Sequence, residues 1–271
     1  MPKQSPPLRI QKPTVQLWWF TAVLIAINVG LFLWQIITGV DVSQPSTQDA
    51  ILWGADYAPL SFLAEPFRLF SSMFFHFGIL HLMLNMWALY IFGSIAEQLF
   101  GRSFYIGLYL FAGLMGSLLS GYLDIQHSLQ IVQQGEFQAD LMPRVSAGAS
   151  GAVMGLGAAL TTLSLLPVLK SQMFILDKKT LLMVMGLNLF IGFSISGINN
   201  AAHIGGMLMG VLLALLWYIA EKRLSHLMQM AALILAAAIC IGFYVYCQHL
   251  VIGITPFWQQ VLAVMQQQLN A

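Results

Sequence analysis

Seven apolar stretches, each about long enough to cross a lipid bilayer, constrain this 271-residue chain more than any other feature. A transmembrane α-helix needs about 20 predominantly apolar residues. Only 8% of the residues are charged, against about 25% in an ordinary soluble domain. The sequence therefore predicts an all-α polytopic membrane helix bundle without a separate soluble domain. The predicted spans are 15–38, 69–96, 103–123, 147–169, 180–198, 201–220 and 228–248.

The basic residues are distributed unevenly between the two sides of this bundle. Because cytoplasmic loops are enriched in Lys and Arg, we expect a multi-pass protein of the cell's inner (cytoplasmic) membrane. Its N-terminus is expected in the cytoplasm and its C-terminus outside, with the first apolar run retained as a signal anchor. In this orientation the inner segments hold Lys3, Arg9, Lys12, Arg102, Lys170, Lys178, Lys179, Lys222 and Arg223, and the outer segments hold only Arg68 and Arg144.

Four polar residues lie on three predicted spans that run in the same direction, from outside to inside. Ser150 lies near the start of the fourth span and His203 near the start of the sixth. The second span carries His81 and Asn85 one helical turn apart, so these two share a helix face. Polar side chains at membrane depth are costly and usually line a site or a path. We therefore expect the four side chains to converge at a similar depth below the outer surface.

Glycines at a four-residue spacing predict close contact between the fourth and sixth spans. Gly151 and Gly155 are four residues apart, and so are Gly206 and Gly210. Small residues at this spacing let helix backbones approach closely. Such an approach is needed because a serine oxygen must lie about 2.6–3.2 Å from the nitrogen of its base. Gly148 lies two residues before Ser150. Together with Gly151, Gly206 and Gly210, it is expected to have a structural role beside the site.

This set of residues is typical of nucleophilic catalysis. Serine is a poor nucleophile until a base accepts its proton, and His203 is the expected base. The span that carries His203 contains no Asp or Glu before Glu221, about 27 Å further along the helix. We therefore predict a Ser–His dyad rather than a triad. The backbone N–H of Ser150, the ring N–H of His81 and the amide of Asn85 are the expected donors to the oxyanion.

Each of these residues also has a purely structural interpretation. The glycine-flanked serine can serve helix packing, His203 can be a hydrogen-bonded core histidine, and Asn85 can tie two helices together. His76 is assigned a structural role, because its five-residue spacing from His81 would point the two side chains apart on a helix. An intramembrane metalloprotease would need a motif such as H-E-x-x-H, which neither histidine begins. A transporter is expected to have repeated halves or interrupted helices, and neither is evident.

Together the motifs resemble those of the rhomboid intramembrane serine proteases over about residues 60–220. Phe67 and Arg68 resemble a Trp-Arg pair in the first loop of that family, with Phe in place of Trp. Glu97 matches a structural acidic residue of the family. The motifs that carry the resemblance are His76…His81-x-x-x-Asn85, Gly148-Ala149-Ser150-Gly151 and Ala202-His203-x-x-Gly206-x-x-x-Gly210, with Ser and His 53 residues apart.

The resemblance implies a six-helix core in which a Ser–His dyad cleaves membrane-spanning substrate proteins near their outer end. It places His81 and Asn85 in the oxyanion hole and implies no metal or organic cofactor. The last span looks like the extra helix of the bacterial six-plus-one subgroup. The expected organisation is a cytoplasmic N-terminus (1–14), a catalytic core (15–220) and a seventh helix with an outer tail (221–271).

The expected partners are transmembrane protein substrates and the lipid bilayer. The net charge of +1 and the lack of a basic patch give no indication of nucleic-acid binding, and the sequence does not indicate an oligomeric state. The alternative function is a catalytically silent rhomboid-like binder of membrane proteins. Such relatives typically lack the serine or the histidine, whereas this chain has both Ser150 and His203.

Two segments outside the spans carry further expectations. The outer loop 39–68 is apolar enough to lie in the membrane interface, whereas the outer loop 124–146 is a long connection. After Pro256, apolar residues recur every four residues. This spacing predicts a short amphipathic helix on the outer membrane interface with Trp258 as its anchor, and a frayed tail is the alternative.

Overall fold

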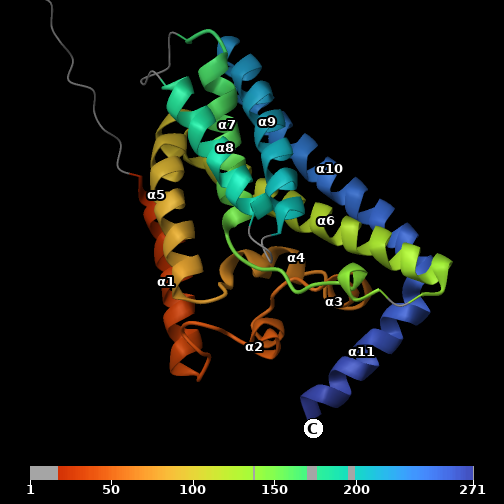
Figure 1. The fold of residues 1–271 in the computed structure, drawn as a ribbon. Helices are drawn as coiled ribbons and strands as arrows, with labels where there is room; N and C mark the ends of the chain where they lie inside the picture. Colours follow the sequence, from red (N-terminus) through yellow and green to blue (C-terminus); the bar gives the residue numbers. More distant parts are fainter. Residues whose placement is uncertain (1–17, 137, 170–175, 195–198, 271) are drawn as a thin grey trace, which may run out of the picture.

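The computed structural model describes residues 18–136, 138–169, 176–194 and 199–270, and most of these residues are helical (Figure 1). The described residues contain no β-strand, so the predicted all-α polytopic membrane helix bundle is confirmed. Five of their helices are long and apolar enough to cross a membrane, and α7 is a shorter apolar helix. Seven helices correspond to the predicted spans: α1 (Trp19–Ile37), α5 (Ile79–Phe100), α6 (Arg102–Gln134), α7 (Ser150–Leu165), α8 (Lys178–Ser194), α9 (Asn200–Lys222) and α10 (His226–Val251).

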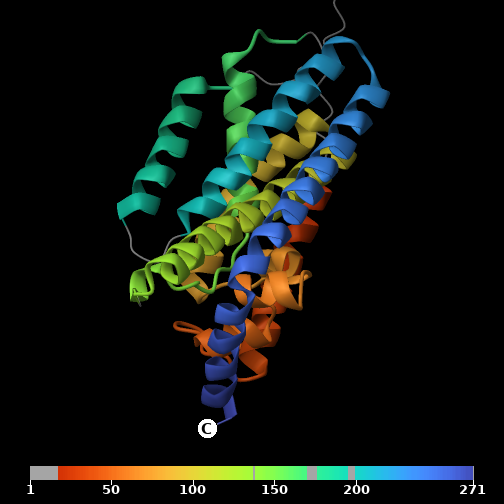
Figure 2. The same ribbon diagram turned by 90° about the vertical axis from the view of Figure 1, so that its right-hand side faces the viewer.

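The centre of the bundle is formed by α6, α7 and α9, which pack against one another. Helix α1 packs on α5 at one side, and α10 covers α6 and α9 at the other. Figure 2 shows α8 standing apart from α9 along much of its length. In the described part of the chain α8 packs mainly against α7. One flank of α7 is therefore less tightly covered than the rest of the core.

Glycines bring α7 and α9 into backbone contact. A Cβ on Gly206 would overlap the carbonyl oxygen of Gly151, and a Cβ on Gly210 would overlap that of Gly155. On its other side, Gly155 lies against the Cβ of Ala112 in α6. The predicted close approach of the fourth and sixth spans is therefore correct. Its cause is that no side chain separates the two backbones.

Two predicted span boundaries are wrong. Helix α5 begins at Ile79 rather than at residue 69, because Gly78 has a φ of 89° and ends the preceding loop. Helix α6 continues to Gln134 rather than ending at residue 123. Its last turns bury Ile125 and Ile131, so packing against the protein extends this helix beyond its apolar window. Part of the expected loop 124–146 is therefore helical.

The outer loop before α5 folds into three short helices. They are α2 (Thr47–Leu52), α3 (Ala58–Leu63) and α4 (Arg68–Ser71), followed by a 3₁₀ turn (Ser72–Phe74). Tyr57 and Phe62 are buried against the protein, whereas Phe67 is 58% exposed. Much of the apolar character of this loop therefore serves internal packing. Its placement in the membrane interface stays a prediction.

The C-terminal segment forms a helix, α11 (Thr255–Asn270), as the spacing predicted, and it extends away from the bundle toward the C-terminus in Figure 1. The expectation that Trp258 anchors this helix in lipid is wrong. The Trp258 side chain is fully buried, and its Nε1–H donates to Ser128 Oγ of α6 at 2.9 Å. An indole N–H buried in protein needs such a partner, so Trp258 attaches α11 to the extended end of α6.

Candidate active site

The structure brings Ser150 and His203 together. Ser150 is the first residue of α7, and His203 lies in the first turn of α9. Ser150 Oγ and His203 Nε2 are 2.8 Å apart, within the range of a nucleophile and its base. The glycine contacts between α7 and α9 allow this distance, because they hold the two helix starts side by side.

The other ring nitrogen of His203 is buried and has no hydrogen-bond partner among the described residues. A neutral histidine that accepts a proton at Nε2 carries its own hydrogen on Nδ1. A catalytic triad would place a carboxylate at that hydrogen. The described part of the chain places none there, so the geometry corresponds to a dyad.

A tight turn leads into Ser150. Gly148 adopts a φ of 122°, a conformation that L side chains rarely adopt. Its N–H donates to the carbonyl oxygen of Ser72 at 2.9 Å, and the N–H of Ala149 donates to His76 Nε2 at 3.4 Å. These two bonds fix the backbone directly before Ser150. Because Ser150 begins α7, its N–H is among the first N–H groups of the helix, which have no partners within the helix.

The ring of His81 lies directly against Gly148. A Cβ on Gly148 would lie 2.9 Å from His81 Nε2, so the glycine is needed for this approach. His81 Nδ1 accepts a hydrogen bond from the backbone N–H of Phe77 at 3.2 Å. Since Nδ1 is the acceptor, the proton of the neutral ring is on Nε2. His81 therefore presents a donor toward the turn that precedes Ser150.

Asn85 is buried on the same face of α5 as His81. Its Nδ2 donates to the carbonyl oxygen of His81 at 3.0 Å. An amide nitrogen carries two hydrogens, so this local bond leaves one of them for another acceptor. The structure thus places Asn85 beside the site with one donor already used inside its own helix.

The expectation that His76 points away from His81 is wrong. Their ring centroids lie 5.2 Å apart in an edge-to-face arrangement. Helical spacing does not apply to this pair, because His76 precedes the start of α5 in a non-helical segment. The fully buried His76 supports the Ser150 turn through Ala149, in keeping with the structural role expected for it.

A cavity of about 1090 Å³ extends from the Ser150–His203 pair to the space between α5 and α8. Its walls are mostly apolar, with Trp87 and Ile91 from α5 facing Leu181 and Val184 from α8. Trp87 is 66% exposed, so the cavity opens sideways at the surface of the bundle. His81 and Asn85 line its inner end together with Ser150.

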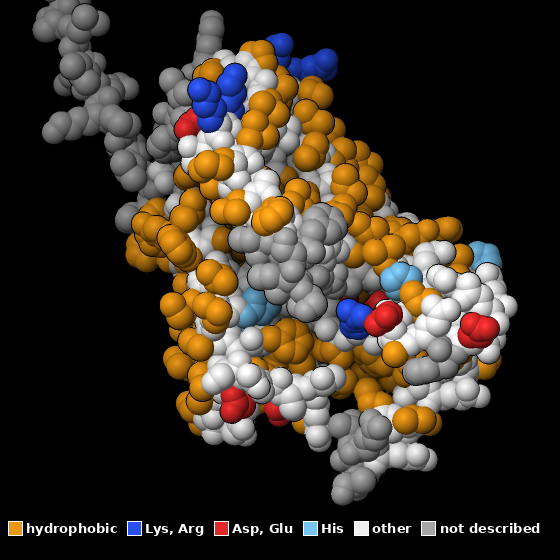
Figure 3. Space-filling view, in the orientation of Figure 1, with side chains coloured by type: hydrophobic (Ala, Val, Ile, Leu, Met, Phe, Trp, Pro, Cys, Tyr) orange, Lys and Arg blue, Asp and Glu red, His pale blue; other side chains and the backbone are white. Residues whose placement is uncertain are grey.

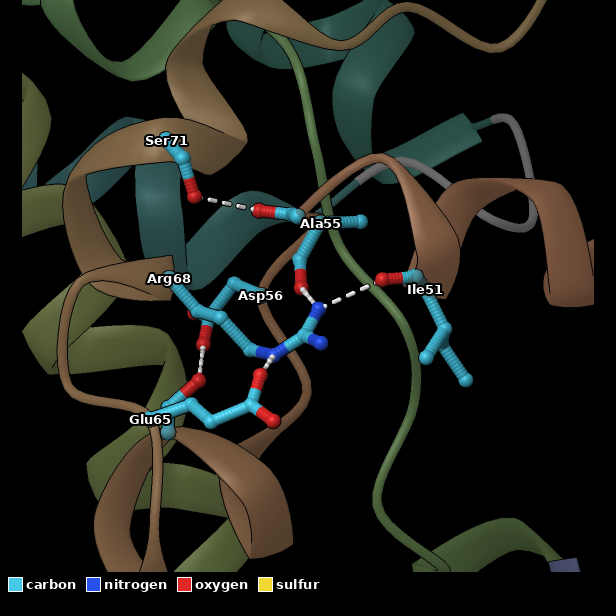
Figure 4. Close-up of polar contacts among 8 residues, drawn as sticks. Ile51, Ala55, Asp56, Glu65, Arg68 and Ser71 are labelled. Carbon is cyan, nitrogen blue, oxygen red and sulfur yellow. Dashed lines mark hydrogen bonds and ion pairs between the residues drawn. The ribbon is translucent and has the colours of Figure 1, made fainter. Parts of the chain in front are cut away.

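Arg68 organises the outer loop close to this site. Its Nη1 donates to the carbonyl oxygens of Ile51 at 2.7 Å and Ala55 at 3.1 Å, and its Nε bonds Glu65 at 2.6 Å. Figure 4 shows these bonds converging on one guanidinium. Asp56, which follows Ala55, forms two backbone hydrogen bonds with Ser146, with N···O distances of 2.9 and 2.8 Å. Ser146 lies four residues before Ser150. The loop is thereby joined to the segment that precedes Ser150.

The side chain of Asp56 is buried and accepts a hydrogen bond from Ser61 Oγ at 2.5 Å. Burial raises the pKa of this carboxyl to about 6, while the Ser61 hydroxyl and the nearby Arg68 guanidinium act in the opposite direction. Removal from water disfavours the charged form of an acid. Asp56 therefore contributes a buried carboxyl with a pKa of about 6 within the outer loop.

Sequence reasoning missed Asn199, which precedes α9 and hydrogen-bonds to Ser120 and Ser146. An asparagine before an apolar run is a helix-start signal, but the two serine contacts have no local signature. Within the described segments no group of three or more His, Cys, Asp or Glu residues is arranged to hold a metal ion.

Comparisons with known proteins agree with the motifs. A family model of the rhomboid domain matches residues 63–220. The chain is 29% identical over 239 residues to rhomboid protease GluP of Bacillus subtilis (strain 168), covering 88% of this chain and 41% of that protein. It is 26% identical over 242 residues to rhomboid protease AarA of Providencia stuartii, covering 83% and 82%. It is 39% identical over 154 residues to RHOMBOID-like protein 5 of Arabidopsis thaliana, covering 55% and 43%.

The chain spans about two fifths of the length of GluP and of the plant protein, and about four fifths of AarA. The family match covers more than half of this chain and includes both Ser150 and His203. On this match and on the helical membrane fold, the chain belongs to the rhomboid family.

Proposed function

We propose that this chain is an intramembrane serine endopeptidase that cleaves transmembrane segments of substrate proteins near the outer face of the membrane. The observation that carries the proposal is the 2.8 Å contact between Ser150 Oγ and His203 Nε2 at the inner end of a cavity in a membrane helix bundle. Two of the similar proteins are named rhomboid proteases, which supports the same reaction class.

The mechanism follows from the placement of these atoms. Ser150 Oγ attacks the carbonyl carbon of the peptide bond while His203 Nε2 accepts its proton. The carbonyl oxygen becomes an oxyanion, which receives hydrogen bonds from His81 Nε2–H, the backbone N–H of Ser150 and the free amide hydrogen of Asn85. His203 then gives its proton to the leaving amine. A water molecule, deprotonated by His203, hydrolyses the acyl-enzyme and releases Ser150.

The cavity supports a membrane-spanning substrate. Its apolar walls on α5 and α8 and its side opening match an apolar peptide segment that arrives from the lipid. A water-filled cleft for a soluble peptide would instead be expected to have a more polar lining. We propose that the substrate segment lies between α5 and α8 with its scissile bond at Ser150.

The charge distribution supports a cytoplasmic N-terminus and an outer C-terminus in an inner (cytoplasmic) membrane. Figure 3 shows Lys and Arg side chains gathered at one end of the molecule, where α9 ends and α8 and α10 begin. Five basic residues of the described part belong to the proposed inner side: Arg102, Lys178, Lys179, Lys222 and Arg223. Arg68 and Arg144 are on the outer side, and the positive-inside rule favours this orientation. Lys3, Arg9, Lys12 and Lys170 lie outside the described residues.

A serine-directed fluorophosphonate probe tests the proposal together with a cleavage assay in lipid vesicles. The wild type should be labelled and should cleave a model transmembrane substrate, whereas Ser150→Ala and His203→Ala should do neither while remaining folded. Ser94→Ala is the matched control, because Ser94 lies on α5 away from the cavity and its hydroxyl bonds only to Ile91 O. A folded wild type that binds substrate without labelling or cleavage would favour the silent binder.

A further inference from the structure

Asn199 lies immediately before α9, four residues ahead of His203. Its short side chain has polar contacts with three separate segments of the chain. None of these contacts involves the reacting atoms, and none of the catalytic steps described above uses Asn199. Its bond to Ser146 nevertheless joins the start of α9 to the segment that leads to Ser150.

The first contact holds the start of α9. Asn199 Oδ1 accepts a hydrogen bond from the backbone N–H of Ala202 at 3.0 Å, which is the geometry of a helix N-cap. His203 is the next residue, so the cap fixes the turn that carries the base. Losing such a cap lets the first turn of a helix fray.

The remaining contacts use the amide nitrogen. Asn199 Nδ2 donates to Ser146 Oγ at 2.8 Å and to Ser120 Oγ of α6 at 2.6 Å. Two acceptors match the two hydrogens of an amide nitrogen, so the donor capacity of the group is fully used. Because the amide is planar, its two donors and its capping oxygen lie in fixed directions relative to one another.

Ser146 connects this contact to the nucleophile. It lies four residues before Ser150, and its backbone is paired with Asp56 of the outer loop. Gly148 and Ala149, which follow it, are held by Ser72 and His76. Ser146 therefore belongs to a segment whose backbone is held at both ends, and its hydroxyl projects from that segment. A group bonded to that hydroxyl is placed relative to Ser150.

We infer that Asn199 is a positioning residue, which holds the helix start that carries His203 against the Ser146 segment that carries Ser150. The inference rests on the proposed dyad function. Displacing catalytic groups by about 1 Å can lower a rate about 10²-fold. Asn199→Ala is accordingly expected to lower kcat about 10- to 100-fold, with KM changed less than about 2-fold.

Three variants separate the contacts. Asn199→Ala removes the cap and both donors, Ser146→Ala removes only one acceptor, and the double variant tests whether the two residues act together. The control is Ser225→Ala, because Ser225 caps α10 through Met228 N at 3.3 Å at the opposite end of the bundle. It removes a helix cap of the same kind without touching the site. Thermal unfolding, kcat, KM and the rate of fluorophosphonate labelling are measured for each.

If Asn199 positions the dyad, Asn199→Ala and Ser146→Ala lower kcat and the labelling rate well beyond any loss of folded protein, and Ser225→Ala does not. The double variant is then no slower than Asn199→Ala within about 2-fold, because coupled residues are non-additive. Wild-type labelling rates in both single variants, or fully additive losses, would overturn the inference.

If Asn199→Ala does not fold, the labelling rate of Ser146→Ala relative to wild type tests the inference. Ser146→Ala removes only the hydroxyl that accepts a bond from Asn199. An inactive wild type, or cleavage that persists in Ser150→Ala, would instead show that the proposed function itself is wrong. The positioning role would then fall with it.

Discussion

Gly206 of α9 lies so close to Gly151 of α7 that a methyl group on Gly206 would overlap the Gly151 carbonyl oxygen. Backbone cannot yield as a flexible side chain can, so this contact has no space for any larger residue. Gly151 directly follows Ser150, and Gly206 lies three residues after His203. Packing and catalytic geometry are therefore coupled at this pair.

Gly206→Leu is expected to destabilise the protein by about 1–3 kcal/mol or more and to abolish cleavage, because α7 and α9 must separate. Gly206→Ala should have the same effects to a smaller degree. Thermal unfolding in detergent and the cleavage rate measure both. Gly242→Ala is the control, since a Cβ at Gly242 of α10 meets nothing within 4 Å. Full activity in Gly206→Leu would contradict the packing argument.

His81→Ala should lower kcat about 10²- to 10³-fold, the cost of losing a principal oxyanion donor, with little change in KM. Its Nε2–H acts on charge that develops only in the transition state. Steady-state kinetics on a transmembrane substrate measure the two constants separately. If KM rose while kcat stayed constant, His81 would be a substrate-binding residue rather than an oxyanion donor.

Asn85→Ala should also lower kcat, but less than His81→Ala, because the Asn85 amide already donates to His81 O. The same kinetic assay measures this difference. Gln98→Ala is a matched control on the same helix, where the amide donates to Ser94 O at 2.8 Å in the same i−4 arrangement, and Gln98 does not line the cavity. Equal, small effects of Asn85→Ala and Gln98→Ala would mean that Asn85 only ties its own helix.

Stability should depend on pH through Asp56. Its folded-state pKa of about 6 lies above the value of 3.8 that is ordinary for an aspartate, so Asp56 binds more protons in the folded protein than in the unfolded chain between these two pH values. The contribution of Asp56 to the free energy of unfolding therefore falls as pH rises from about 4 to about 6. Asp56→Asn should reduce this slope and, at pH values above 6, raise the temperature of the unfolding midpoint.

The exposed Asp140, 3.9 Å from Arg144, provides the control for that experiment, because Asp140→Asn removes a carboxyl that is not buried. The groups that act on the Asp56 carboxyl are the Ser61 hydroxyl and the Arg68 guanidinium, and Asp56 in turn interacts electrostatically with Asp124. An undiminished slope in Asp56→Asn would assign the titration to another group.

Deleting residues 255–271 should leave kcat nearly unchanged, because the dyad and its donors lie on α5, α7 and α9. The deletion should lower the midpoint of thermal unfolding, since it removes the buried Trp258 and its bond to Ser128. Trp258→Ala should reproduce most of that loss, whereas Val264→Ala on the exposed side of α11 should not. A large fall in kcat at temperatures where the truncated protein stays folded would implicate α11 in catalysis.

The predicted topology is tested by labelling a tag at Ala271 in intact cells. With a cytoplasmic N-terminus and seven spans, this tag should be accessible from outside without permeabilising the inner membrane. A tag inserted after Arg223, between α9 and α10, should be labelled only after permeabilisation. The reverse pattern would invert the orientation, and labelling of both tags under one condition would change the number of spans.

The sequence alone was sufficient for the class of fold and for the family. Apolar runs of membrane length predict helices because no other open structure satisfies its backbone groups in lipid. The motifs around Ser150 and His203 predicted the rhomboid family, which the family match confirms. The spacing of Gly206 and Gly210 predicted the close approach of α9 to α7, because small residues one turn apart lie on one helix face. The division into 1–14, 15–220 and 221–271 stays a prediction.

Other features depended on contacts between residues far apart in the chain. Hydropathy could not place the start of α5, which Gly78 sets ten residues later than predicted, nor the end of α6, which packing extends to Gln134. The sequence pattern also could not show that Trp258, which was predicted to be a lipid anchor, is buried against Ser128. The bonds of Asn199 to Ser120 and Ser146 join residues 79 and 53 positions apart. Local periodicity carries no information about such pairs, since only the packing of α6, α7 and α9 brings them within hydrogen-bond distance.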